Sequence, residues 1–288
     1  EYLIVGIDIA KDQHHAFFGT ATGKTLLRRL VFSNDHEGFR KLLDHAEALR
    51  VRHGLKKVVY GMEPTANYHK PLGEYLISLG GMVVLVSGVV VKRNRESLDG
   101  RWDKHDVKDS ANVADLISQG KCLYYDHPGA RLRGLRNLLS LKRRLKKQEH
   151  GYRVRIRNHL IAQYFPEMDR DYARLGAEGL SIVRWCLPAS EIAQLDVDPF
   201  IERVTSRRIR MEKRRRLEAL WEKAAESIGC DGVPGVEHEA KVMVEGLRQI
   251  REMIKETEQK IEGLCKQFPE YQYLLTIPGF GPDVSAKV

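Results

Sequence analysis

Four acidic residues stand where carboxylates can bind a metal ion. Asp8 lies within an N-terminal apolar segment, and Glu63 directly follows another apolar segment. A carboxylate among apolar residues is unfavourable unless a cation or a hydrogen-bond donor compensates its charge. Asp106 and Asp109 are three residues apart, which brings both to one face of a helix, where their charges repel unless a cation lies between them.

Carboxylate oxygens are the ligands that Mg²⁺ and Mn²⁺ prefer, and two such ions about 4 Å apart can activate a nucleophile and stabilise the leaving oxygen in phosphodiester cleavage. Each acid alone also fits a simpler role. Asp8 and Glu63 could face water at strand ends, and Asp106 and Asp109 could stabilise a helix N-terminus. Asp103 and Asp115 lie nearby, but the helical period puts Asp115 on the opposite side from Asp106.

Alternating strand and helix patterns must position these acids. Apolar, β-branched segments predict strands at 2–9, 15–20, 25–32, 57–62 and 82–91, and helical spacing predicts helices at 36–51, 68–79 and 106–118. An antiparallel start followed by alternating helices and strands indicates an α/β domain at 1–128, with the mixed sheet of the ribonuclease-H type. Acids at a first strand, a later strand end and a helix start can converge at one end of such a sheet.

The rest of the chain has helical patterns. Apolar residues at steps of three and four predict a long helix over 132–156, and an insert with Pro188 and Pro199 follows it. Seven residues then form an a/d seam: Met243, Leu247, Ile250, Ile254, Thr257, Ile261 and Leu264. We expect a helical coiled-coil region at 129–270. We expect its seam to join two chains in a dimer, and the alternative is that it closes on helix 132–156 of its own chain.

The charge balance favours a polyanionic partner. Lys and Arg number 48 against 39 Asp and Glu, which gives a net charge of +9. The candidate nucleic-acid contacts are Lys92, Arg93, Arg95, Lys104, Arg143, Arg144, Lys146, Lys147, Arg207 and Arg208, with Gly279 and Gly281 in a turn described below. Charged runs are also common on plain solvated helix faces.

Two function classes are disfavoured. The four cysteines lie far apart without a C-x-x-C pair, which predicts reduced cytosolic thiols rather than a disulfide framework or a zinc site. The apolar run Met82–Val91 is too short to span a bilayer, so no membrane partner is expected. The chain begins with Glu1 and stops at Val288 within a new element, and we expect it to be a truncated piece of a longer protein.

Three sequence blocks together resemble the DEDD transposases of insertion sequences, which are related to the Piv invertases. The blocks are Gly6–Lys11, Glu63–His69 and Lys104–Ser110. The third departs from the usual family pattern at His105 and Ser110, and neither change removes a carboxylate. The resemblance extends over the whole chain in order. It continues in Leu275–Pro282, which looks like the opening of the family's C-terminal transposase domain and predicts a helix-hairpin-helix-like turn at 271–288.

The resemblance implies a RuvC-like catalytic domain in which Asp8, Glu63, Asp106 and Asp109 bind Mg²⁺ or Mn²⁺, with two ions expected. It implies DNA transposition with donor and target DNA as partners, guided by a structured bridge RNA. We also expect a homo-oligomer, a dimer or, in the synapse, a tetramer. The expected location is cytoplasmic and nucleoid-associated, in a prokaryote. The family's nucleophilic serine would lie beyond Val288, because Ser285 is too close to the turn.

Three other interpretations remain open. A RuvC-like junction resolvase would share the first domain but needs neither the helical extension nor the turn at Pro278. An actin-like ATPase also opens with a segment like Gly6-Ile7-Asp8, but it needs glycine-rich phosphate loops, and Ala10 stands where a glycine is expected. A non-catalytic nucleic-acid-binding coiled-coil protein would not need Asp106 and Asp109 on one face.

Overall fold

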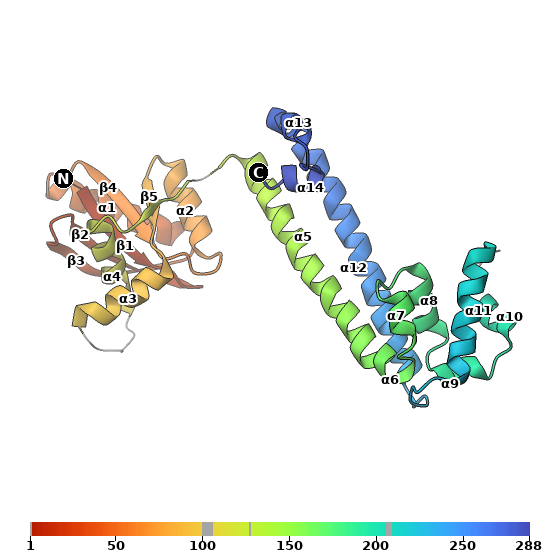
Figure 1. Cartoon of the computed structure of the whole chain (residues 1–288). Coiled ribbons are helices and arrows are strands. Elements are labelled where there is room, and N and C mark those ends of the chain that lie inside the picture. Colours follow the sequence, from red (N-terminus) through yellow and green to blue (C-terminus); the bar gives the residue numbers. More distant parts are fainter. Residues whose placement is uncertain (1, 100–105, 127, 206–208) are drawn as a thin grey trace. The chain divides into compact units, whose positions relative to one another are not determined.

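The computed structural model describes residues 2–99, 106–126, 128–205 and 209–288 (Figure 1). Within these ranges, the side chains at 95–99, 106 and 107 are not described. The chain divides into two compact units, Glu1–Pro128 and Gly129–Val288, and each is considered by itself. None of the helices among the described residues is long and apolar enough to cross a membrane.

The first unit contains a six-stranded mixed sheet in the order β3-β2-β1-β4-β5-β6. Its strands are β1 (Tyr2–Asp8), β2 (Gln13–Thr20), β3 (Thr25–Ser33), β4 (Lys57–Met62), β5 (Met82–Leu85) and β6 (Leu123–Tyr124). Strand β1 pairs antiparallel with β2 and parallel with β4, and β5 pairs parallel with β4 and antiparallel with β6. The predicted α/β fold with a mixed sheet is confirmed.

Helices cover both faces of this sheet. Helices α1 (His36–Arg52) and α2 (His69–Ser78) bury their apolar residues against one face. Helices α3 (Gly88–Asp99) and α4 (Asp106–Ser118) pack against the other. Strand residues alternate between the two layers, as the two-residue period of a strand requires. Leu3, Val5 and Ile7 join the α1/α2 core, whereas Ile4 joins the α3/α4 core.

The prediction of a single strand over residues 82–91 is wrong. Strand β5 ends at Leu85, and α3 begins at Gly88. The apolar run continues because Val86 and Val91 remain buried in the α3/α4 core, so a strand and a helix that are buried in succession produce one uninterrupted pattern. As a result, Lys92, Arg93 and Arg95 belong to a helix rather than to a connection after a strand.

A buried amide network joins α3 to α4. The Asn94 side-chain amide donates to the Asn112 carbonyl oxygen at 2.7 Å and to a carboxylate oxygen of Asp115 at 2.8 Å. Asn112 in turn donates to the main-chain carbonyl of Val91 at 2.8 Å, and it is only 2% exposed. Buried polar groups that satisfy one another in this way fix the two helices as one layer.

The second unit is built on two long helices that lie antiparallel and side by side (Figure 1). Helix α5 (Ala130–Arg155) continues through a π-helical turn, η1 (Ile156–Ile161), into α6 (Ala162–Tyr164), and α12 (Val236–Cys265) returns along α5. The seam residues Leu247, Ile254 and Ile261 are buried within the chain. The seam therefore packs on the long helix of its own chain, which is the alternative to the expected contact between chains.

Short helices pack at the two ends of this hairpin. One apolar core unites the ends of both long helices with the insert helices α7 (Met168–Tyr172), α8 (Ala177–Trp185), α9 (Ala189–Ala193), α10 (Val197–Val204) and α11 (Met211–Ala225). At the other end, α13 (Pro269–Leu275) and α14 (Pro282–Ser285) pack against Leu135 and Ile261. Lys142 pairs with both Glu258 and Asp283, which ties α14 to the two long helices.

Candidate active site

Asp8 and Glu63 end two neighbouring parallel strands. Ile7 of β1 is paired with Met62 of β4, so the next residues along both strands are Asp8 and Glu63. Neighbouring strands lie about 4.8 Å apart, which places the two acids beside each other. Ile7 and Met62 are both fully buried in the α1/α2 core. Because successive residues alternate, Asp8 and Glu63 fall on the side of the sheet that α3 and α4 cover.

Two paired glycines allow α4 to lie close to these strands. Gly6 and Gly61 are partners in the register of β1 and β4. A Cβ atom at Gly6 would lie 2.2 Å from the main-chain oxygen of Ser110, and one at Gly61 would lie 2.1 Å from Cδ1 of Ile117. A side chain at Gly6 would meet backbone atoms of α4 and push the helix away, so Gly6 sets the close contact between α4 and the sheet, while Gly61 leaves the space that the Ile117 side chain fills.

Asp109 reaches the same region from α4. It immediately precedes Ser110, the residue in contact with Gly6, and its exposed fraction is only 4%. Asp109 therefore lies at the interface between α4 and the sheet, close to the strand that ends in Asp8. Asp106 is the first residue of α4, one turn earlier, and its side chain lies outside the described part of the chain.

Glu63 lies against the start of α3. A Cβ atom at Gly88, the first residue of α3, would be 2.5 Å from Oε1 of Glu63. Because Gly88 has no side chain, the Glu63 carboxylate can lie at the N-terminus of α3, which is the positive end of the helix dipole. Lys92 is exposed and lies one helical turn after Gly88, so its ammonium group belongs to the same side of α3.

The chemistry of these acidic side chains suits the binding of a divalent cation. Asp8, Glu63 and Asp109 offer hard oxygen donors from two strand ends and one helix on a single face of the sheet. Among the described residues, no group of three or more His, Cys, Asp or Glu side chains is close enough to form a metal site as it stands. The described residues do not include the side chain of Asp106, the fourth acid. Asp115, on the same helix, accepts hydrogen bonds from the side-chain amides of Asn94 and Gln119.

The other sequence-predicted contacts are spread over both units. On α3, Lys92 and Arg93 are exposed, whereas the side chain of Arg95 and the whole of Lys104, Arg207 and Arg208 lie outside the described residues. On α5, Arg143, Arg144 and Lys147 are exposed and form no ion pair within the described part of the chain, and Lys146 pairs with Glu149 at 3.6 Å.

The basic cluster at the start of α11 is mostly engaged within the fold. Lys213 and Arg216 pair with Glu178, and Arg214 pairs with Asp198 and Glu218. A structural role therefore fits these side chains better than a phosphate contact does. Gly279, with a φ of 88°, and Gly281 are exposed in the turn between α13 and α14. Because α14 has four residues, its dipole adds little, and phosphate binding there stays a prediction.

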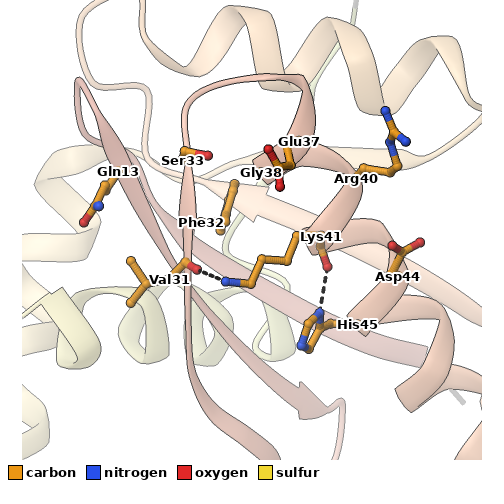
Figure 2. A pocket seen from close by; sticks show the side chains of 10 residues that line it. All are labelled: Gln13, Val31, Phe32, Ser33, Glu37, Gly38, Arg40, Lys41, Asp44 and His45. Atoms are coloured by element: carbon orange, nitrogen blue, oxygen red, sulfur yellow. Dashed lines mark hydrogen bonds between the residues drawn. The ribbon is translucent and has the colours of Figure 1, made fainter.

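A hollow of about 760 Å³ lies away from the acids, between β3 and α1 (Figure 2). In it, the Lys41 ammonium donates to the main-chain oxygen of Val31 at 2.9 Å, and the imidazole of His45 bonds to the Lys41 carbonyl at 2.8 Å. None of the sequence-predicted site residues lines this hollow. It is open and polar, and Lys41 and His45 already have main-chain partners, so the acidic face remains the better candidate site.

Comparison with known proteins defines the class of this chain and then its family. A family model described as a transposase, that of the IS110-type DEDD transposases, matches residues 5–166. Because the match covers more than half of the sequence, the chain belongs to the IS110-type DEDD transposase family. It is thus a DNA transposase, a DNA-cleaving class of enzyme whose members generally use divalent metal ions.

Two other comparisons add little. No curated protein matches the chain significantly. A solved structure of T. thermophilus RuvC in complex with a Holliday junction substrate resembles it with a TM-score of 0.30 and 11% identity, over 43% of this chain and 99% of that one. A TM-score of 0.30 is too low to indicate a shared fold, so the family assignment depends on the sequence match.

Proposed function

We propose that this transposase cleaves and exchanges DNA strands at a site formed by Asp8, Glu63, Asp106 and Asp109, which bind Mg²⁺ or Mn²⁺, with two ions expected. The observation that supports the proposal best is the common face of the three described acids. Asp8 and Glu63 end adjacent parallel strands, and Asp109 is held over the same strands by the close contact at Gly6.

The residues around the acids have separable tasks in this proposal. When bound, the cations polarise the scissile phosphate and lower the pKa of the attacking group. The paired glycines and the Asn94–Asn112 contact keep α4, and with it Asp109, at a fixed distance from β1. Gly88 leaves room for the Glu63 carboxylate. Lys92 is suited to contact a phosphate of the substrate strand near that carboxylate.

Metal-dependent cleavage of end-labelled DNA tests this function. The full-length protein is incubated with DNA carrying the ends of its own element, in Mg²⁺, Mn²⁺ or EDTA, with a Holliday junction and ATP as parallel substrates. We expect element-specific cleavage that EDTA abolishes, and no ATP turnover. Cleavage of every junction without sequence preference would favour a resolvase, and cleavage that persists in EDTA would refute the metal site.

A guide RNA is the second part of the proposal. Arg143, Arg144 and Lys147 on α5 are exposed and without ion pairs among the described residues, so they are available for a phosphate backbone. We expect Arg143→Gln/Arg144→Gln/Lys147→Gln to weaken RNA and DNA binding. The slope of log affinity against log salt should flatten by about 0.7–0.9 for each phosphate that the variant no longer neutralises, because fewer counterions are released.

A matched control is available on the other long helix. Lys241, Lys255 and Lys260 are exposed on α12, and their change to Gln removes the same net charge. Fluorescence anisotropy across a salt series compares the two triple variants. An equal decrease of affinity in both would mean that only net charge matters, and an unchanged salt slope in the α5 variant would assign its cations to the solvated surface.

Assembly into a dimer, or a tetramer when DNA ends are synapsed, also belongs to the proposal, as does a cytoplasmic, nucleoid-associated location. Because the seam of α12 packs on α5 of the same chain, the contact between chains would have to use another surface. Light scattering at tens of micromolar, with and without DNA, measures the association state. A monomer under both conditions would end this part of the proposal.

A further inference from the structure

Two adjacent histidines of β2 point to opposite sides of the sheet. His14 is fully buried, its ring lies against Phe32 and Phe39, and its Nδ1 accepts the main-chain N–H of Ala10 at 3.2 Å. Burial lowers the pKa of His14 below its usual value. His14 is therefore part of the α1/α2 core, and its role is structural. His15, the next residue, is half-buried and falls on the α3/α4 side.

His15 stands directly opposite Asp8. The two residues are partners in the antiparallel register of β1 and β2. Directly opposed residues project from the same side of a sheet, with Cβ atoms about 4.5–5.5 Å apart. Phe17 lies two residues further along β2, and therefore on the same side of the sheet as His15. Because Phe17 packs against the α3/α4 core, the side to which His15 projects is fixed. The imidazole of His15 is thus within reach of the Asp8 carboxylate.

The row across the three strands places His15 at the edge of the acidic site. Along it come His15 on β2, Asp8 on β1 and Glu63 directly after β4. Helix α4 contacts both β1 and β2, and Ser110 lies on Gly6, which is itself paired with Phe17. Asp109 therefore approaches Asp8 from above, Glu63 flanks it on one side, and His15 flanks it on the other.

We infer that His15 is a positioning residue for Asp8: its ring N–H donates to the Asp8 carboxylate and fixes the oxygen that faces the metal. The inference rests on the proposed metal site and adds a residue outside the four acids. A carboxylate that binds a cation is held by such outer partners, and their removal weakens metal affinity by about 10- to 100-fold. Imidazole is suited to this task because it can donate without bringing a full second charge.

Metal affinity tests the inference without relying on turnover. Mn²⁺ binding to the wild-type protein, His15→Leu, His15→Gln and Asp8→Asn is measured by isothermal titration calorimetry, alongside the Mg²⁺ concentration that gives half-maximal DNA cleavage. We expect His15→Leu to bind Mn²⁺ about 10- to 100-fold more weakly. His15→Gln, which retains an N–H donor, should recover part of that affinity. The thermal stability of both variants without metal should match that of the wild type.

His45→Leu is the matched control, because it removes an exposed histidine from α1 on the far side of the sheet. It should bind Mn²⁺ as the wild type does. Normal Mn²⁺ affinity in His15→Leu beside abolished affinity in Asp8→Asn overturns the role of His15 alone. A wild-type protein that binds no Mn²⁺ overturns the metal site and this inference together. If His15→Leu is unstable, the comparison of His15→Gln with the wild type decides.

Discussion

Asp109→Asn is expected to abolish metal-dependent DNA cleavage while leaving the fold intact. The change keeps the size of a side chain that is 4% exposed at the interface of α4 and the sheet, so packing is preserved. An amide oxygen is a weaker ligand than a carboxylate and does not neutralise a dication. Losing several kcal/mol of charge stabilisation at the phosphate corresponds to a rate lower by about 1000-fold. Single-turnover cleavage of labelled DNA measures it.

Asp115→Asn is the matched control, because Asp115 lies on the same helix but bonds to Asn94 and Gln119. An amide oxygen at this position can still accept from both partners, so cleavage should stay near the wild-type rate. Mn²⁺ calorimetry on both variants separates a missing ligand from a disrupted fold. Full Mg²⁺-dependent cleavage by Asp109→Asn would remove it from the site, and Asp103 would become the next candidate.

Asp8 and Glu63 could be proposed as metal ligands from the sequence because each interrupts or ends an apolar pattern, whereas Asp106 and Asp109 were proposed from their spacing of three residues. Asp8 and Glu63 break or end runs of buried residues, and their fold positions follow once the strands are located. The glycines that hold α4 close were not predicted, although a signal exists. Each of the two strand-end acids is preceded two residues earlier by a glycine, Gly6 and Gly61. In a strand that spacing puts glycine and acid on the same face, which indicates a helix packed closely beside the acid.

Other features depend on contacts between distant segments. The register that pairs His15 with Asp8 comes from the β1–β2 hairpin and cannot be derived from either segment alone. The break between β5 and α3 was hidden because both elements are apolar where they are buried. Likewise, the heptad pattern of α12 specifies an apolar seam but not its partner, and α5 of the same chain occupies it. The period of the apolar residues indicates which face of a helix or strand is buried. Contacts between distant parts of the chain decide which segment covers that face.

Gly6→Ala is expected to damage both stability and cleavage. The new Cβ would stand 2.2 Å from the main-chain oxygen of Ser110 and 2.5 Å from the main-chain nitrogen of Ala114. Both are backbone atoms of α4, so no rotamer change relieves the clash and the helix must move. Overpacking of this kind costs about 1–3 kcal/mol of folding free energy. Because Asp109 moves with α4, cleavage should fall further than the decrease in folded protein explains.

Gly88→Ala supplies the comparison that separates these two effects. The described atoms nearest to its Cβ belong to the side chain of Glu63, whose flexible end can move, so stability should remain near that of the wild type while Mn²⁺ affinity falls. Gly151→Ala, with open space around the added atom in the interior of α5, should raise stability by about 0.5–1 kcal/mol through the higher helix propensity of alanine and leave Mn²⁺ affinity unchanged. Thermal unfolding and Mn²⁺ calorimetry on the three variants measure both. If Gly6→Ala melts and cleaves like the wild type, α4 does not lie on β1 in the way that brings Asp109 to Asp8.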